Sequence, residues 1–130
     1  MRSSFPAVAI ALFVTSGAAF AQQPDATPRK SCFLVTQFDN WRAADNKTVY
    51  IRTNMTRYYR LDMAQECPAL RWPDAHLIMN VHGPDTICSA VDWDLKVSND
   101  PRGFAMPCIV KTMTELAPAE VQALPPKFKP

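Results

Sequence analysis

Glycine is nearly missing from this sequence, which has three glycines in 130 residues. Phosphate-binding loops need glycine because their backbone must approach the phosphates closely, and neither G-x-x-x-x-G-K-[ST] nor G-x-G-x-x-G occurs. The G-x-S-x-G frame that presents a catalytic serine is also missing. These absences exclude the common motifs of nucleotide-binding proteins and α/β-hydrolases.

The sequence also lacks an excess of charge of one sign. It has 14 basic and 12 acidic side chains, and the formal net charge is +2. Proteins that bind nucleic acids or membrane surfaces through bulk charge carry a clear basic excess. We therefore expect no nucleic-acid partner.

Motifs for metals and redox chemistry are missing as well. No C-x-x-C pair is present, which argues against a zinc site or a thioredoxin-like function. The only histidines, His76 and His82, lie ~20 Å apart if they share one straight strand. One ion cannot bridge that distance, so we expect neither a metal nor a cofactor.

The longest apolar run lies near the N-terminus. Arg2 precedes the apolar residues 7–14, and a small-x-small cleavage site ends at Ala21. This arrangement predicts a signal peptide over residues 1–21. The run is shorter than the ~20 residues that a transmembrane helix needs, and no second run follows. The sequence therefore predicts a periplasmic or secreted protein without a transmembrane segment after cleavage.

Four cysteines follow the predicted leader, and in an exported chain they predict two disulfides with three possible pairings. Cys32 and Cys108 each open an apolar strand near one end of the domain, so we expect a bridge between them. Cys67 ends a short predicted helix, and Cys88 begins a long predicted strand. We expect these two cysteines to form the second bridge.

The rest of the chain divides into a polar, disordered lead-in (22–30), one domain (31–124) and a proline-rich tail (125–130). Short runs of alternating or β-branched residues predict six strands, at 32–41, 48–53, 57–61, 76–81, 86–97 and 107–113. In the fifth run, one face is expected to carry Ile87, Val91, Trp93, Leu95 and Val97.

Two short helices are expected. Asp62 caps the first, which ends before Pro68, and Pro118 opens the second, which ends at Leu124. The predicted fold is mostly β: a small antiparallel barrel or sandwich of about six strands with one or two short helices, stapled by two disulfides.

Several segments spread over residues 31–124 form a recognisable series. They are SCFL (31–34), Trp41, VYI (49–51), YRL (59–61), CPAL (67–70), Ile87-Cys88, Asp92, CIV (108–110) and LAPAE (116–120). Together they resemble a bacterial family of small exported domains of unknown function. The resemblance implies a protein of the bacterial envelope, in the periplasm, and it supplies no catalytic or binding residues.

Arginine and tyrosine are concentrated in residues 50–60. If 48–53 and 57–61 pair as a hairpin, six side chains form a basic, aromatic patch: Tyr50, Arg52, Arg57, Tyr58, Tyr59 and Arg60. Arginine suits carboxylate or phosphate groups, and tyrosine stacks on sugars or bases. The patch predicts binding of an anionic envelope polymer. The alternative is ordinary strand surface with one residue of the Tyr58-Tyr59 pair turned inward.

One pair of acidic residues has a spacing that is compatible with catalysis of glycoside hydrolysis. Asp92 and Asp94 share a face if they lie on one strand, with Cα atoms ~6.6 Å apart, and glycoside hydrolases use carboxylates ~5–9 Å apart. Lys96 on the same face favours a polar outer surface instead.

We therefore expect a non-catalytic exported module that binds, or structurally supports, an anionic polymer or another protein of the envelope. Two alternatives remain. One is a small hydrolase that uses Asp92 and Asp94. The other is an inhibitor of a lytic or proteolytic enzyme, because small disulfide-stapled β domains suit preorganised binding.

Overall fold

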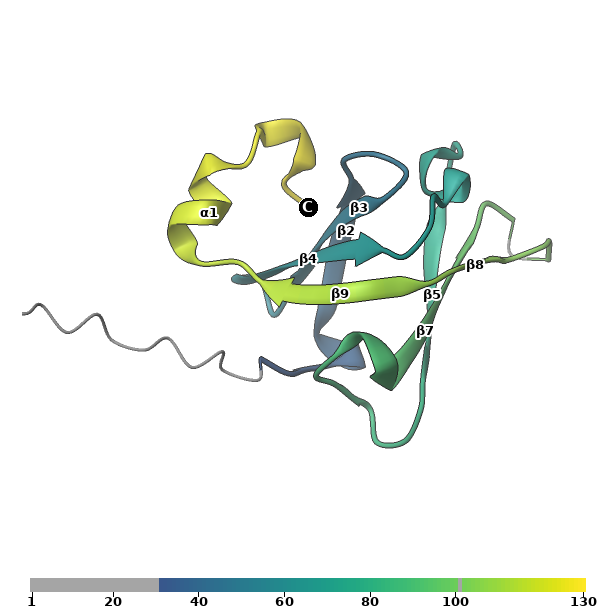
Figure 1. Cartoon of the computed structure of the whole chain (residues 1–130), viewed down its shortest axis with the longest axis horizontal. Helices are drawn as coiled ribbons and strands as arrows, with labels where there is room; N and C mark the ends of the chain where they lie inside the picture. Colours follow the sequence, from purple (N-terminus) through teal and green to yellow (C-terminus); the bar gives the residue numbers. More distant parts are fainter. Residues whose placement is uncertain (1–30, 101) are drawn as a thin grey trace, which may run out of the picture.

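The computed structural model describes residues 31–100 and 102–130, so the predicted signal peptide and the predicted lead-in lie outside the described residues. The described chain forms antiparallel strands with one short α-helix (Figure 1). The strands are β1 (Phe33–Leu34), β2 (Phe38–Ala43), β3 (Thr48–Thr53), β4 (Arg57–Met63), β5 (His76–Val81), β6 (Thr86–Ile87), β7 (Trp93–Ser98), β8 (Met106–Cys108) and β9 (Val110–Glu115). The helical segments are η1 (Val35–Gln37), η2 (Pro68–Arg71), η3 (Ala90–Asp92), α1 (Pro118–Ala123) and η4 (Pro126–Phe128). The expected mostly β, antiparallel fold is confirmed.

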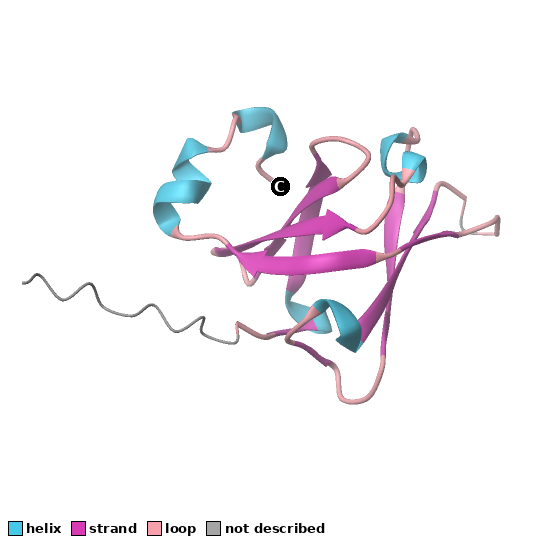
Figure 2. Cartoon of the chain, viewed as in Figure 1, coloured by secondary structure: helices cyan, strands magenta, loops and turns pink. Residues whose placement is uncertain are grey.

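The strands form three sheets, with the orders β2-β3-β4-β9, β5-β7-β8 and β1-β6. Only Ile109 separates β8 from β9, so the two larger sheets are joined where one strand passes into the other (Figure 2). Among the described strands the sheets do not close, because β2 and β5 each pair with a single neighbour. The closed barrel, one of the two expected architectures, is therefore wrong.

Alternation along the strands builds one core between the sheets. Every second residue of β3 is buried, and the same holds at Tyr59, Leu61 and Met63 of β4 and at Trp93, Leu95 and Val97 of β7. Phe33 of β1 and Ile87 of β6 complete this cluster. Burial of apolar area on these inner faces is the main force that holds the layers together.

Two runs predicted as single strands are each divided by a 3-10 turn. η1 separates β1 from β2, and η3 separates β6 from β7. The carboxylate of Asp92 accepts hydrogen bonds from the N–H groups of Cys88 and Ser89, at 2.9 and 2.7 Å, and so stabilises η3. As a result Val91 is 81% exposed and does not share the core face with Trp93, contrary to the expected pattern.

Of the two expected helices, the first is wrong and the second is confirmed. β4 continues to Met63, and Asp62 bonds to Arg60 instead of capping a helix. Pro68 begins the 3-10 turn η2. The second helix is α1, which starts at Pro118 as expected. No helix within the described residues is long and apolar enough to cross a membrane.

The proline-rich segment 125–130 is part of the folded structure. It contains η4, which lies against β2, and Pro130 is buried. The carbonyl of Pro130 accepts a hydrogen bond from Arg52 Nη1 at 2.9 Å. Figure 1 shows this segment, in yellow, folding back from α1 toward β2 and β3.

The two disulfides join Cys32 to Cys88 and Cys67 to Cys108, so the expected pairing is wrong. Strand pairing explains the difference. Phe33 lies opposite Ile87 in the β1–β6 pair, which brings the adjacent Cys32 and Cys88 together. Likewise, Ala64 N–H donates to the carbonyl of Ile109, which brings the start of η2 beside the end of β8.

Candidate functional site

The hairpin expected from residues 48–61 is present as β3 and β4. Tyr50 lies opposite Arg60, and Arg52 lies opposite Tyr58. Directly opposed residues of an antiparallel pair share a face, so these four side chains lie on the outer face of the sheet. The hairpin therefore brings together these four residues of the predicted patch.

Tyr59 lies on the other face. It pairs with Ile51, its exposed fraction is 0%, and its ring lies 5.1 Å from the ring of Phe33 between centroids. Burial raises the pKa of its hydroxyl above the ordinary value. Tyr59 is therefore a core residue, and its predicted role in stacking on a ligand is wrong. The alternative expectation is that one of the two adjacent tyrosines turns inward, and Tyr59 is that residue.

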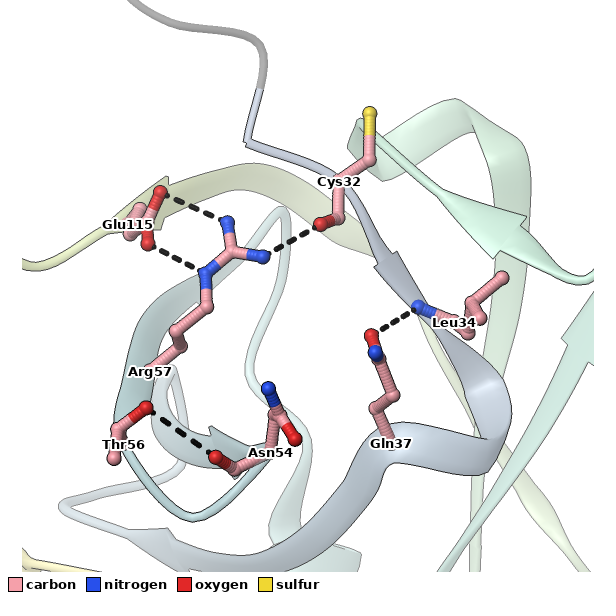
Figure 3. Close-up of polar contacts among 7 residues, drawn as sticks. All are labelled: Cys32, Leu34, Gln37, Asn54, Thr56, Arg57 and Glu115. Carbon is pink, nitrogen blue, oxygen red and sulfur yellow. Dashed lines mark hydrogen bonds and ion pairs between the residues drawn. The ribbon is translucent and has the colours of Figure 1, made fainter.

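Arg57 is held by the protein itself (Figure 3). Its Nε and Nη2 donate to the two carboxylate oxygens of Glu115, at 2.8 and 3.2 Å, and Nη1 donates to the carbonyl of Cys32 at 2.9 Å. The hydrogen bond to Glu115 is the main reason that the pKa of Arg57 is raised. This arginine joins β4, β9 and the segment before β1, which is a structural role.

Arg52 also has partners within the protein. It donates a hydrogen bond to the carbonyl of Pro130, and its Nε lies 3.8 Å from a carboxylate oxygen of Asp39. Arg60 is the most accessible of the three predicted arginines: its side chain is 46% exposed and pairs with Asp62 at 2.8 Å. The hydrogen bond to Asp62 raises the pKa of Arg60.

Arg60 lines an open depression of about 680 Å³. Three further cationic side chains line it: Lys47 from the turn between β2 and β3, Arg71 from η2 and Lys111 from β9. We call this site the basic depression. Within the described part of the chain, none of these three cations forms an ion pair.

Three acidic residues line the same depression, and two of them accept hydrogen bonds from other groups of the protein. Asp45 Oδ1 accepts the N–H groups of Lys47 and Thr48, at 2.7 and 2.8 Å, which fixes the turn before β3. Asp62 accepts from Arg60 Nε at 2.9 Å and from Thr112 Oγ1 at 3.3 Å. Glu66 is exposed. With four cations and three carboxylates the lining carries a formal charge of +1, and Lys47, Arg71 and Lys111 are not paired with a carboxylate among the described residues.

A second hollow, of about 530 Å³, lies between η3, β7 and the β8–β9 junction. Its lining includes Val91, which is 81% exposed, and Ile109, which is 65% exposed. His82 Nε2 lies 2.8 Å from Asp94 Oδ2 beside it. Asp92 and Asp94, the pair of the alternative hydrolase hypothesis, thus have different partners, because Asp94 faces His82 while Asp92 stabilises η3.

We expect the pKa of His82 to lie above its ordinary value in the wild type and to fall toward that value in Asp94→Asn. The hydrogen bond to Asp94 is the largest cause of the raised pKa, followed by the charge of the same carboxylate. A raised pKa means that this pair stabilises the fold below the unfolded pKa and loses that contribution as pH rises through the folded pKa. Titration of the imidazole signals by NMR measures both values, and identical curves for the two proteins would contradict the ion pair.

Comparison with known proteins identifies one family. The model of a family of unknown function, DUF6491, matches residues 1–127. No curated protein and no solved structure matches the chain. The expected resemblance to a family of unknown function is confirmed. Since the match covers nearly the whole chain, this protein belongs to the DUF6491 family.

Proposed function

We propose that this protein is a non-catalytic binding module of the bacterial envelope, and that the basic depression binds an anionic polymer. One observation carries the proposal: four cationic side chains from four segments converge on one open hollow, and three of them have no carboxylate partner among the described residues. Charge-assisted hydrogen bonds from such groups suit carboxylates and phosphates.

The shape of the site supports a polymer as the ligand. Small molecules usually bind in concave, mostly apolar pockets that bury most of their surface. The basic depression is open to solvent and lined mainly by polar and charged side chains. Tyr50 lies opposite Arg60 in the hairpin, and we propose that its ring contacts a sugar of the polymer.

The envelope is proposed as the location on two grounds. Disulfides persist in oxidising compartments, and this chain has two. The leader over residues 1–21 has the features of a signal peptide.

We expect the triple variant Lys47→Gln/Arg71→Gln/Lys111→Gln to bind a carboxylated glycan such as polygalacturonate about 10- to 100-fold more weakly than the wild type. Exposed charge pairs contribute up to about 1 kcal/mol each, so three contacts account for this range. Wild-type binding should also weaken as salt is raised, because exposed charges are screened. Isothermal titration calorimetry at low and high salt measures both effects.

A charge-matched control is the variant Arg42→Gln/Arg102→Gln/Lys127→Gln, which removes three exposed cations that do not line the depression. It should bind nearly as well as the wild type. Equal losses in both triple variants would indicate unspecific attraction by net charge. No loss in the first variant would remove the basic depression as the site.

A second candidate function, inhibition of a lytic or proteolytic enzyme, is favoured by Phe104. This side chain is 72% exposed in the connection between β7 and β8. Exposed aromatic residues on a rigid scaffold often supply most of the energy of a protein–protein contact. An inhibitor should block a muramidase or a protease in a panel assay, and Phe104→Ser should abolish the inhibition.

A further inference from the structure

The open edges of the larger sheets are not alike. An edge strand exposes unpaired N–H and C=O groups, and proteins protect such edges with bulges, charges or proline. β2 has an irregular register between Phe38 and Asn40 and carries Asp39 and Arg42. β8 contains Pro107, and β9 carries Lys111 and Glu115. These three edge strands therefore have features that oppose pairing with another chain.

β5 has none of these features. It pairs with β7 without irregularity from His76 to Val81, and no neighbour within the described structure occupies its other side. Its sequence, HLIMNV, contains no proline, lysine, arginine or acidic residue. Figure 1 shows β5 on the side of the molecule away from α1. An unprotected apolar edge of this length is suited to pairing with another strand.

One hydrogen bond shows which backbone groups of β5 point toward β7 and which point away from it. His82 N–H donates to the carbonyl of Asp92 at 2.8 Å, in the same register that pairs Val81 with Trp93. In an antiparallel ladder the residues that bond to a given neighbour alternate. His76, Ile78 and Asn80 therefore point their backbone groups toward β7.

The intervening residues Leu77, Met79 and Val81 then point their N–H and C=O groups away from β7. Within the described residues, no hydrogen bond to these groups is present. The spacing of the three residues is symmetric about Met79. The edge is therefore complementary to itself.

We propose that β5 pairs antiparallel with β5 of a second copy of this chain, about a two-fold axis at Met79. In this register Met79 lies opposite its own copy, and Leu77 lies opposite Val81. Each of the three residues donates one hydrogen bond and accepts one across the interface. A shift by two residues in either direction leaves an outward-pointing residue unpaired, so the centred register satisfies the most backbone groups.

The side-chain contacts in this register are also favourable. Leu77, Met79 and Val81 face the core, where they are only partly buried. Pairing brings each of them against an apolar side chain of the second copy, which extends the core across the axis. On the outer face Ile78 meets Asn80, so no like charges oppose each other along the strand. The two β5-β7-β8 sheets become one continuous sheet, which is the isologous arrangement of a two-fold dimer.

Sedimentation over about 1 µM to 1 mM, the range of weak to moderate dissociation constants, tests for the dimer. Hydrogen exchange measured by NMR at the two ends of this series tests the register. The amides of Leu77, Met79 and Val81 should exchange slowly only at high concentration. The amides of Ile78 and Asn80, bonded to β7, should stay protected throughout.

Two double variants test the interface itself. Ile78→Lys/Asn80→Lys places like charges opposite each other on both sides of the axis and should abolish the dimer. Ile78→Glu/Asn80→Lys places opposite charges in the same positions across the axis, and also opposite Lys96 and Asp94 of β7, and should retain the dimer. Circular dichroism at low concentration should show a folded monomer for both variants.

Three results would overturn the proposal. They are a monomer at every concentration, a dimer that the double-lysine variant leaves intact, and rapid exchange of the outward amides in the dimer. A monomer that protects these amides only when another protein is added would assign the edge to a different partner.

Discussion

Replacing Cys67 and Cys108 together by alanine is expected to lower the free energy of unfolding by roughly 4 kcal/mol. The bridge closes a loop with a sequence separation of 41, and its removal returns that conformational freedom to the unfolded chain. Both cysteines are 3% exposed, so the change also leaves a small void in the core. For a domain of this size the melting temperature should fall by roughly 20 °C, which differential scanning calorimetry measures.

The other disulfide provides the comparison. The Cys32–Cys88 bridge has a sequence separation of 56. Because the entropic contribution grows only with the logarithm of loop length, its removal should also cost roughly 4 kcal/mol. A loss below about 1 kcal/mol for either pair would show that the unfolded chain is already restricted there. Since small domains have a net stability of about 5–15 kcal/mol, losing both bridges should leave the domain close to unfolding.

Local patterns predicted the strand positions well. β3 and β5 coincide with the expected runs 48–53 and 76–81. Both runs are rich in residues that favour strands, and turn residues such as Asp45 and Gly83 border them. In such cases the information that defines an element is contained in the element and its flanks.

Contacts between distant segments could not be predicted in this way. The Cys32–Cys88 pairing depends on β1 and β6, which are two residues each and have no signal of their own. The turn η3 depends on the bonds of a single carboxylate, Asp92, which the alternation of residues does not reveal. In both cases a tertiary or side-chain contact overrides the local pattern.

The candidate site was predicted only in part for the same reason. The concentration of arginine in residues 52–60 predicted a site, but Arg52 and Arg57 have distant partners in the sequence, Pro130 and Glu115. The cations that join Arg60 in the basic depression come from three other segments of the chain. Only the pairing of β4 with β9 brings Lys111 near Arg60, and no sequence motif marks that pairing.

Replacing Tyr59 by alanine is expected to lower the free energy of unfolding by about 3–5 kcal/mol, the usual cost of removing a large aromatic residue from a core. The ring is fully buried against Phe33, and the guanidinium of Arg57 lies 5.4 Å from its centroid. The variant therefore creates a cavity and also removes support from the Arg57–Glu115 pair. Urea denaturation followed by circular dichroism measures the loss.

The neighbouring residue gives a matched control. Tyr58 lies on the outer face opposite Arg52 and is only partly buried, so Tyr58→Ala should cost no more than about 1 kcal/mol. Tyr59→Phe keeps the ring and should also be tolerated, because its volume is nearly unchanged. If the alanine variants of the two tyrosines lost equal stability, the inward orientation of Tyr59 would be contradicted. The expected difference separates a core residue from a surface residue at adjacent positions of one strand.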